Sequence, residues 1–481
     1  MYKDDSLTLH TDLYQINMMQ VYFNQGIHNK KAVFEVYFRQ LPFKNGFAVF
    51  AGLERIVNYL ENLTFSETDI AYLKDLGYPK DFLDYLANLK LELTINSALE
   101  GDLVFANEPI FQVEGPLAQC QLVETALLNI LNYQILIATK AARIRSVIED
   151  APLLEFGTRR AQEMDAAIWG ARAAVIGGAD ATSNVRAGKI PVSGTHAHAL
   201  VQAYGNDYDA FKAYASTHKD CIFLVDTYDT LKIGVPNAIR VAKELGDKIN
   251  FLGVRLDSGD LAYLSKQVRK QLDAAGFPDA KIYASNDLDE NTILNLKMQK
   301  AKIDVWGVGT NLITAYDQPA LGAVYKIVSI ENDQGVMQDT IKLSNNAEKV
   351  STPGKKQVWR ITSRAKGKSE GDYITFADTD VNALEEINMF HPTYTYINKT
   401  VRDFDAVPLL VPIYDKGQLI YDLPSLDEIK NYATKKLDEL WNEYKRVLNP
   451  QDYPVDLAKD VWDNKMTLID NMRKKARDLS E

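Results

Sequence analysis

Hydrophobic and polar residues alternate over short distances in the first part of the chain and recur at helical spacing in between. Alternation with a period of two predicts β-strands, and an apolar face repeating every three to four residues predicts helices. The predicted elements are strands at 32–38 and 46–50, helices at 53–63 and 82–89, strands at 92–94 and 103–113, and a long helical stretch over 118–149.

The pattern changes near residue 153, where short apolar runs begin to alternate with helical segments. Seven runs follow this rule, at 153–156, 173–179, 190–194, 221–226, 251–257, 281–287 and 303–309. Strands separated by helices indicate βα units and a parallel sheet. Seven units favour a barrel over an open doubly wound sheet, and an α/β barrel builds its active site just past the carboxyl ends of its strands.

After about residue 330 the alternation of short apolar runs with helical segments is no longer regular. Turn residues at 352–356 precede predicted strands at 358–361 and 373–376, and long charged helices are predicted at 426–448 and 464–479.

Polar residues follow nearly every predicted strand of the parallel region. They are Gly157-Thr158-Arg159-Arg160, Asp180, Thr195-His196-Ala197-His198, Asp226-Thr227, Arg255 with Asp257-Ser258-Gly259-Asp260, Ser285-Asn286-Asp287, and Gly307-Val308-Gly309-Thr310. Any one Asp or Ser here could simply cap a helix. Seven polar strand ends with arginines and two histidines among them instead indicate a site.

Several of these residues suit an anionic ligand. Glycines in the Gly307–Thr310 stretch allow backbone N–H groups to face a phosphate, although a tight turn with positive φ explains them equally well. Arg159, Arg160 and Arg255 bring planar guanidinium groups that match carboxylates and phosphates.

His196 and His198 stand two residues apart, which places them on opposite sides of an extended segment. They are therefore a poor metal-binding pair, and one of them can face the pocket. A carboxylate such as Asp226 or Asp257 could fix the tautomer of that histidine and prepare it as an acid, base or phosphate acceptor. A purely structural histidine is the alternative.

Composition narrows the ligand class. The chain has 481 residues, of which 54 are Lys or Arg and 65 are Asp or Glu, giving a net charge of −11. An acidic chain does not favour nucleic acid or anionic membrane, but a local basic pocket can still bind a small polyanion. Cys120 and Cys221 lie in apolar runs, which predicts buried thiols in a reducing compartment.

The sequence shows neither a signal-peptide pattern at its start nor an uninterrupted apolar stretch long enough to span a bilayer. The most apolar stretch, 125–138, contains Asn129, Asn132 and Gln134. A cytoplasmic protein is predicted.

The segments 155–162, 194–198, 254–260 and 307–310 occur in the order found in nicotinate phosphoribosyltransferases, and the chain resembles that family closely. The resemblance extends to 9–19, 108–144 and 342–360, so it covers nearly the whole chain. It implies an α/β fold: an irregular TIM-like α/β barrel with an N-terminal α/β sandwich domain and an additional C-terminal region. The implied domains are 1–117, 118–330 and 331–481.

The family resemblance also implies a reaction. Nicotinate and phosphoribosyl pyrophosphate would give nicotinate mononucleotide and pyrophosphate, coupled to ATP hydrolysis with Mg²⁺, as the entry step of NAD salvage. A homodimer with its active site near the subunit interface is implied as well.

Motif by motif, the resemblance assigns roles to individual residues. His198 would be phosphorylated by ATP, with His196 as second choice and Asp226 orienting the ring. Tyr14 and Phe156 would sandwich the pyridine ring, Tyr14 reaching into the partner subunit's site. Thr195, Arg255 and Arg159 would contact oxygens of the base or of a phosphate. Asp257 would contact the ribose hydroxyls. The 5-phosphate would be bound by Gly307, Gly309 and Thr310. The Mg²⁺ ligands are not assigned.

The choice of base is less well defined by the sequence. A nicotinamide-using relative has an Asp at the position of Asp180, where it faces the amide, so the role of Asp180 here is ambiguous. The segments 254–260 and 352–356 favour nicotinate. The alternatives are a nicotinamide or quinolinate phosphoribosyltransferase, and a non-catalytic NAD-metabolite binding protein.

Overall fold

The computed structural model describes residues 7–188, 190–346 and 349–479. The described residues form two compact units, one within Met1–Leu136 and Ala320–Glu481 and the other within Ile137–Pro319. The predicted domain limits at residues 117 and 330 stay predictions.

The first unit contains a seven-stranded antiparallel sheet in the order β13-β12-β1-β5-β3-β19-β20. Its strands are β1 (Lys31–Tyr37), β3 (Thr94–Ser97), β5 (Phe111–Pro116), β12 (Val324–Glu331), β13 (Met337–Asp339), β19 (Val411–Asp415) and β20 (Gln418–Leu419). The central strand β1 is buried over five consecutive residues because both faces of the sheet are covered. Phe34 stacks on Tyr325 of the neighbouring β12, with ring centroids 4.7 Å apart.

A second sheet of this unit has the order β17-β16-β21-β15-β14-β18. Its strands are β14 (Lys356–Ser363), β15 (Lys368–Phe376), β16 (Glu386–Phe390), β17 (Asn398–Arg402), β18 (Phe404–Pro408) and β21 (Val455–Leu457). A short ribbon pairs β2 (Ala48–Val49) with β4 (Leu103–Val104). The helices that begin in this unit are α1 (Leu13–Asn24), α2 (Leu53–Glu61), α3 (Glu67–Asp75), α4 (Lys80–Ala87), α5 (Leu117–Leu122), α6 (Glu124–Ile148), α14 (Leu426–Glu439) and α15 (Lys459–Asp478).

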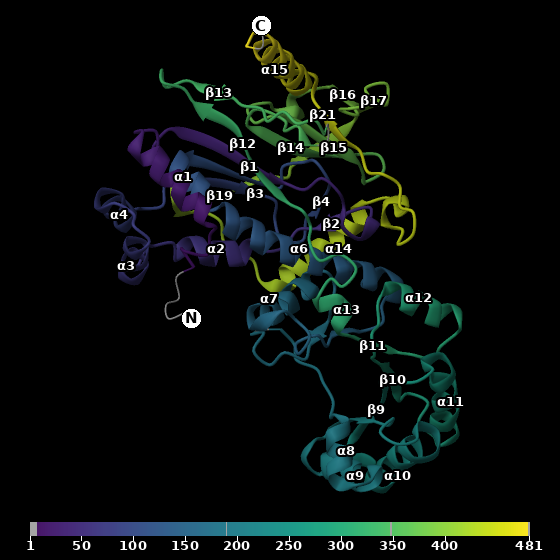
Figure 1. Ribbon diagram of the computed structural model, residues 1–481. Helices are drawn as coiled ribbons and strands as arrows, with labels where there is room; N and C mark the ends of the chain where they lie inside the picture. The colour runs from purple at the N-terminus through teal and green to yellow at the C-terminus, as the bar shows by residue number, and fades with distance from the viewer. Residues whose placement is uncertain (1–6, 189, 347–348, 480–481) are drawn as a thin grey trace. The chain divides into compact units, whose positions relative to one another are not determined.

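The second unit is built on a parallel sheet of six strands, in the order β7-β6-β11-β10-β9-β8. The neighbouring strands β9, β10 and β11 are labelled in Figure 1. The strands are β6 (Leu153–Glu155), β7 (Ala181–Thr182), β8 (Asp220–Leu224), β9 (Asn250–Leu256), β10 (Lys281–Ala284) and β11 (Val305–Val308). The helices between and after them are α7 (Glu163–Ile176), α8 (His198–Tyr204), α9 (Asp207–Thr217), α10 (Val235–Leu245), α11 (Leu261–Ala274), α12 (Glu290–Met298) and α13 (Thr310–Ile313). The sheet curls as a half-barrel, and the predicted α/β fold class is confirmed.

Two of the seven predicted strands are wrong. Residues 173–176 are the end of helix α7, and the strand of this region is β7, which begins at Ala181. The run is rich in alanine, the best helix former, and a buried helix is as uniformly apolar as a buried strand. The run 190–194 contributes a single bridge, between Val192 and Thr182.

In the described parts of the chain, no helix combines the length and the apolar character that a membrane crossing requires.

Candidate active site

A cluster of polar side chains lies at the carboxyl edge of the parallel sheet in the second unit. The strands run in the same direction, so the residues that follow them meet at one edge. Asp226 follows β8, Asp257 follows β9, and Ser285 follows β10, while His198 opens helix α8.

His198 faces two carboxylates. Its Nε2 lies 3.9 Å from Oδ1 of Asp226 and 3.7 Å from Oδ2 of Asp257. Its Nδ1 lies 3.1 Å from the Thr227 hydroxyl, which fixes the orientation of the ring. The His198 side chain is 37% exposed, so the imidazole remains accessible to a ligand while its neighbours hold it.

Asp226 anchors the loop after β9. Its Oδ2 accepts hydrogen bonds from the backbone N–H of Asp257 at 2.9 Å and from the Ser258 hydroxyl at 2.6 Å. Its Oδ1 is buried and has no hydrogen-bond partner among the described residues, and this oxygen is the one nearest His198. A buried acceptor without a donor is costly in free energy, which is typical of a functional site.

Arg255 holds three side chains of the cluster together. Its guanidinium donates to the Thr195 hydroxyl at 2.8 Å, to the Ser285 hydroxyl at 2.9 Å and to Oδ1 of Asp257 at 3.2 Å. The same guanidinium lies 5.6 Å from the centroid of the Phe156 ring. Arg255 therefore links β9 with the ends of β6 and β10.

Asp257 is held in its ionised form. Partial burial would raise the pKa of its carboxyl group, but the hydrogen bond from Ser285, the charge and hydrogen bond of Arg255 and the charge of His198 outweigh that effect, and the pKa is lowered.

Phe156 packs directly on the glycine segment after β11. A Cβ atom on Gly307 would lie 2.7 Å from the Phe156 ring, and a Cβ on Gly309 would lie 3.0 Å from the Phe156 carbonyl oxygen. Neither glycine has a positive φ, so the explanation by a left-handed turn is wrong. Glycine is required here by close approach, and Thr310 follows it as the first residue of α13.

His196 has a structural role and does not face the cluster. It is 7% exposed, and its Nε2 accepts the backbone N–H of Leu224 at 3.1 Å. Its ring packs beside Phe211 and Tyr214. Burial, together with the nearby charges of Arg255 and His198, lowers its pKa to about 4, so the ring is neutral near pH 7.

The structure does not bring Asp180 to the cluster. Asp180 directly precedes β7, at the opposite end of the strands, where it accepts from Arg145 and from the backbone N–H of Leu153 at 2.9 Å. Arg159 lies in the turn after β6, with an exposed side chain that forms no ion pair within the described part of the chain.

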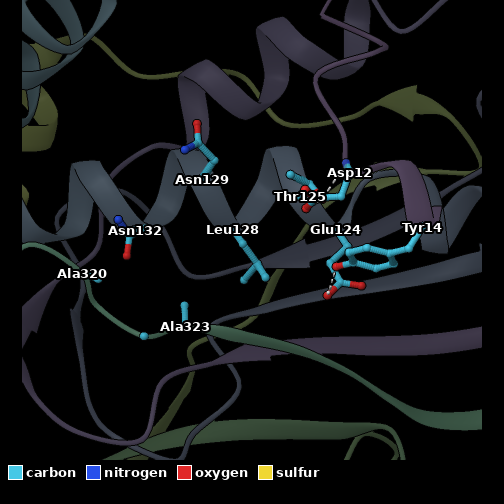
Figure 2. A pocket seen from close by; sticks show the side chains of 10 residues that line it. Asp12, Tyr14, Glu124, Thr125, Leu128, Asn129, Asn132, Ala320 and Ala323 are labelled. Atoms are coloured by element: carbon cyan, nitrogen blue, oxygen red, sulfur yellow. Dashed lines mark hydrogen bonds between the residues drawn. The ribbon is translucent and has the colours of Figure 1, made fainter. Parts of the chain in front are cut away.

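Tyr14 belongs to the first unit, where it borders a cavity of about 310 Å³ (Figure 2). Its hydroxyl donates to Glu124 at 3.4 Å, and its side chain is 48% exposed. Figure 2 shows Thr125, Asn129 and other residues of α6 along the same cavity. Tyr14 thus presents an aromatic ring to an open cavity lined by both polar and apolar residues.

Comparison with known proteins decides the family. Three family models match in succession: the nicotinate phosphoribosyltransferase N-terminal domain over residues 9–132, the nicotinate phosphoribosyltransferase family over 152–357, and the C-terminal domain over 355–465. The nicotinate phosphoribosyltransferase of Bacillus subtilis is 63% identical, over 98% of this chain and 97% of that protein. This chain belongs to the nicotinate phosphoribosyltransferase family.

Other known proteins match over similar lengths. The human nicotinate phosphoribosyltransferase is 32% identical, over 93% of this chain and 94% of that protein. The crystal structure of human nicotinic acid phosphoribosyltransferase superposes with a TM-score of 0.84 at 30% identity, covering 95% of this chain and 99% of that one. A nicotinate-nucleotide pyrophosphorylase from Pyrococcus furiosus matches with a TM-score of 0.69 at 25% identity, covering 91% and 97%.

The sequence pattern assigned no role to three hydroxyl-bearing residues of this chain, although each of them contacts the cluster. Thr227 contacts His198, Ser258 donates to Asp226, and Ser285 joins Arg255 to Asp257. Their positions in the sequence could have indicated a role. Thr227 and Ser258 stand next to Asp226 and Asp257, which had assigned roles, and Ser285 directly follows a strand.

Proposed function

We propose that this protein joins nicotinate to the ribose of phosphoribosyl pyrophosphate, forming nicotinate mononucleotide and pyrophosphate in the salvage of NAD. The observation that carries the proposal is the 63% identity with the Bacillus subtilis nicotinate phosphoribosyltransferase over nearly the full length of both chains. A site with a histidine, two carboxylates and an arginine at one sheet edge supports it.

In the proposed reaction the pyridine nitrogen bonds to C1 of the ribose as the bond from C1 to the pyrophosphate oxygen breaks. The sugar passes through an oxocarbenium-like state, so the protein contributes mainly by positioning and by charge. We assign one face of the pyridine ring to Phe156, which the Gly307 contact holds in place. The base carboxylate or a phosphate is assigned to Arg255, with Thr195 and Arg159.

The remaining substrate contacts follow the geometry of the strand ends. Asp257 is assigned to the ribose hydroxyls because an ionised carboxylate accepts their hydrogen bonds. The segment of Gly307, Gly309 and Thr310 is assigned to the 5-phosphate, for which backbone N–H groups are suitable donors. Asp180 is left out of the substrate site because it bonds Arg145 at the far end of the strands.

ATP coupling is assigned to His198. In this step a ring nitrogen forms a bond to the γ-phosphorus of ATP while the bond to the ADP oxygen breaks. The exposed ring and its contacts with Thr227, Asp226 and Asp257 support this assignment. His196, with its buried ring and its bond to the Leu224 amide, is unsuited to the step.

Mg²⁺ is proposed as a companion of the phosphate groups. Within the described ranges, no group of three or more His, Cys, Asp or Glu side chains could hold a metal ion. This does not fit a site built from protein ligands alone, whereas Mg²⁺ is commonly held largely by substrate phosphates and water. No step is assigned to the ion.

A homodimer in the cytoplasm is also proposed. Tyr14 is half exposed beside an open cavity, as a residue that reaches a partner subunit's site would be. Cys120 and Cys221 are buried free thiols, which suits a reducing compartment.

The function is tested by steady-state rates with nicotinate, nicotinamide and quinolinate, each with and without ATP. We expect nicotinate to be used with the highest kcat/KM and to respond to ATP. A preference for nicotinamide would favour the nicotinamide enzyme instead. Calorimetric binding of phosphoribosyl pyrophosphate without pyrophosphate release from any base would indicate a non-catalytic binding protein.

A further inference from the structure

Ser285 is the neutral side chain that links the arginine of the cluster to its carboxylate. Its hydroxyl oxygen lies 2.9 Å from Nε of Arg255, and the hydroxyl donates to Oδ1 of Asp257. Ser285 is 5% exposed, so water does not replace these bonds freely. The two charged partners also contact each other at 3.2 Å.

Backbone pairing places Ser285 at this point. In the register of β9 and β10, Ala284 pairs with Leu256, and the Ser285 N–H donates to the Leu256 carbonyl at 2.9 Å. The next two residues, Asn286 and Asp287, have φ values of 107° and 38°. Asn and Asp are the non-glycine residues that adopt positive φ most readily, so the chain can turn directly after Ser285.

The direction of the hydrogen bonds follows from the partners. Arginine has only donors, so the Ser285 oxygen must accept from Arg255, and its single proton is left for the Asp257 carboxylate. Oδ1 of Asp257 is thereby occupied by Ser285 and Arg255, while Oδ2 remains directed toward His198 at 3.7 Å.

We propose that Ser285 is a positioning residue that holds the Asp257 carboxylate in place, with one oxygen on Arg255 and the other facing His198. The proposal rests on the proposed function, in which Asp257 and His198 act on the substrates. Ser285 itself is not assigned a contact with substrate.

The charged and titratable groups around Asp257 are Arg255 on β9, His198 on α8 and Asp226 after β8. Arg255 and His198 lower the pKa of Asp257, as does the Ser285 hydrogen bond, and burial raises it. Without the Ser285 hydroxyl, fewer groups oppose the rise that burial causes in the pKa of Asp257, so Asp257 becomes easier to protonate.

The test compares the pH dependence of kcat/KM for nicotinate in wild type, Ser285→Ala and Ser285→Cys. Losing a hydrogen bond to a charged group typically shifts the pKa of that group by about one unit or more. We therefore expect the acid limb of the kcat/KM profile of Ser285→Ala to move upward by about one pH unit. The Cys variant, with a weaker donor, should move less. Ser265→Ala is the matched control, because Ser265 is a fully buried serine of the same unit that bonds only backbone groups.

A double variant separates positioning from general damage. If Ser285 acts through Asp257, Ser285→Ala should change kcat/KM less than twofold in an Asp257→Asn background, because the group it serves no longer titrates. A uniform loss at every pH, or a full loss in the Asn background, would overturn the proposal. An unchanged acid limb in Ser285→Ala would do the same.

A measurement without substrate keeps this test separate from the proposed function. An Asp with a lowered pKa stabilises the fold above the ordinary carboxyl range, and that contribution disappears as the pH falls. The difference in Tm between wild type and Ser285→Ala should therefore be constant near neutral pH and narrow on acidification. A wild type that uses no base would contradict the proposed function alone, whereas a difference in Tm that stays constant with pH would contradict the role of Ser285.

Discussion

At the scale of single residues, two histidines separated by one alanine have opposite environments. His196 is 7% exposed and its Nε2 accepts a backbone N–H, whereas His198 stands between two carboxylates with an accessible ring. The boundary between them is the start of helix α8, which begins at His198. The sequence spacing predicted that the two would diverge, and the packing around β8 decides which one faces the cluster.

The first prediction concerns phosphorylation. After incubation with γ-labelled ATP, wild type should carry an acid-labile, base-stable phosphoryl group, and His198→Ala should lose it. His196→Asn should keep the label because its ring does not reach the cluster. Retention of the label in His198→Ala would exclude this assignment.

The second prediction concerns the pH dependence of stability. Because the pKa of His196 falls from 6.5 in the unfolded chain to about 4 in the fold, its neutral form stabilises the protein fully above pH 6.5. That contribution, on the order of 3 kcal/mol, should be lost as the pH falls from about 6.5 to about 4.

Urea unfolding of wild type and His196→Asn measures this contribution of His196. The difference in unfolding free energy between them should shrink across that pH range, and a constant difference would contradict the buried neutral ring. His218→Asn is a suitable control, because His218 lies on an exposed segment of the same unit.

At the scale of elements, the site depends on where adjacent strands end. The β6 and β11 ends are in contact through Phe156 and Gly307, and the β9 and β10 ends are joined through Arg255 and Ser285. Each pair is adjacent in the sheet, although its members are far apart in the sequence. The polar strand ends therefore form one site because parallel pairing aligns them.

A third prediction tests the contact between β6 and β11. Gly307→Ala should cost about 1–3 kcal/mol of stability and raise the KM for nicotinate, because its new Cβ would lie 2.7 Å from the Phe156 ring. In a Phe156→Leu background the stability cost should become smaller, since the obstructing ring atoms are gone. Equal costs in both backgrounds, measured by urea unfolding, would show that the contact is not responsible.

At the scale of the whole molecule, charge is distributed unevenly. The chain carries −11 overall, and the polar cluster combines the guanidinium of Arg255 with the carboxylates of Asp226 and Asp257. Arg159 is exposed in the turn after β6. In the first unit the buried carboxyls Asp102, Glu108 and Asp372 surround the buried guanidinium of Arg360. Arg360 binds Asp372 at 2.7 Å and the Leu103 carbonyl at 2.6 Å, which ties β14 to the strand β4.

The fourth prediction concerns the pH dependence of stability in the first unit. Burial and the neighbouring Asp372 raise the pKa of Glu108 well above its usual range, so its protonated form is favoured more in the fold than in the unfolded chain. A group with a raised pKa contributes stability that is fully present below its ordinary pKa and is lost as the pH rises through its folded pKa. Glu108→Gln, which is always neutral, should therefore lose less Tm than wild type as the pH rises above the ordinary carboxyl range.

The variant Arg360→Met tests the opposite change in the same group of buried charges, the loss of its guanidinium. Removing the guanidinium should cost about 3–5 kcal/mol because it leaves buried carboxylates unpaired. If the Tm values of Glu108→Gln and wild type change in parallel as the pH rises above the ordinary carboxyl range, Glu108 is not the titrating group.

The sequence by itself determined the alternation of strands and helices and the polar residues at the strand ends. It also determined that the two histidines face different sides, and it identified the family. These features are local or depend on motif order, so they can be read along the chain. It misassigned 173–179 as a strand because a buried alanine-rich helix and a buried strand are equally apolar.

Only the tertiary structure decided the contacts between distant strand ends. It joined Ser285 to Arg255 and Asp257, buried His196, required glycine beneath Phe156 and directed Asp180 to Arg145. The physical reason is that strand register and side-chain packing depend on residues far apart in sequence. A polar residue after a strand is predictable from its neighbours, but its partner is fixed only when the sheet assembles.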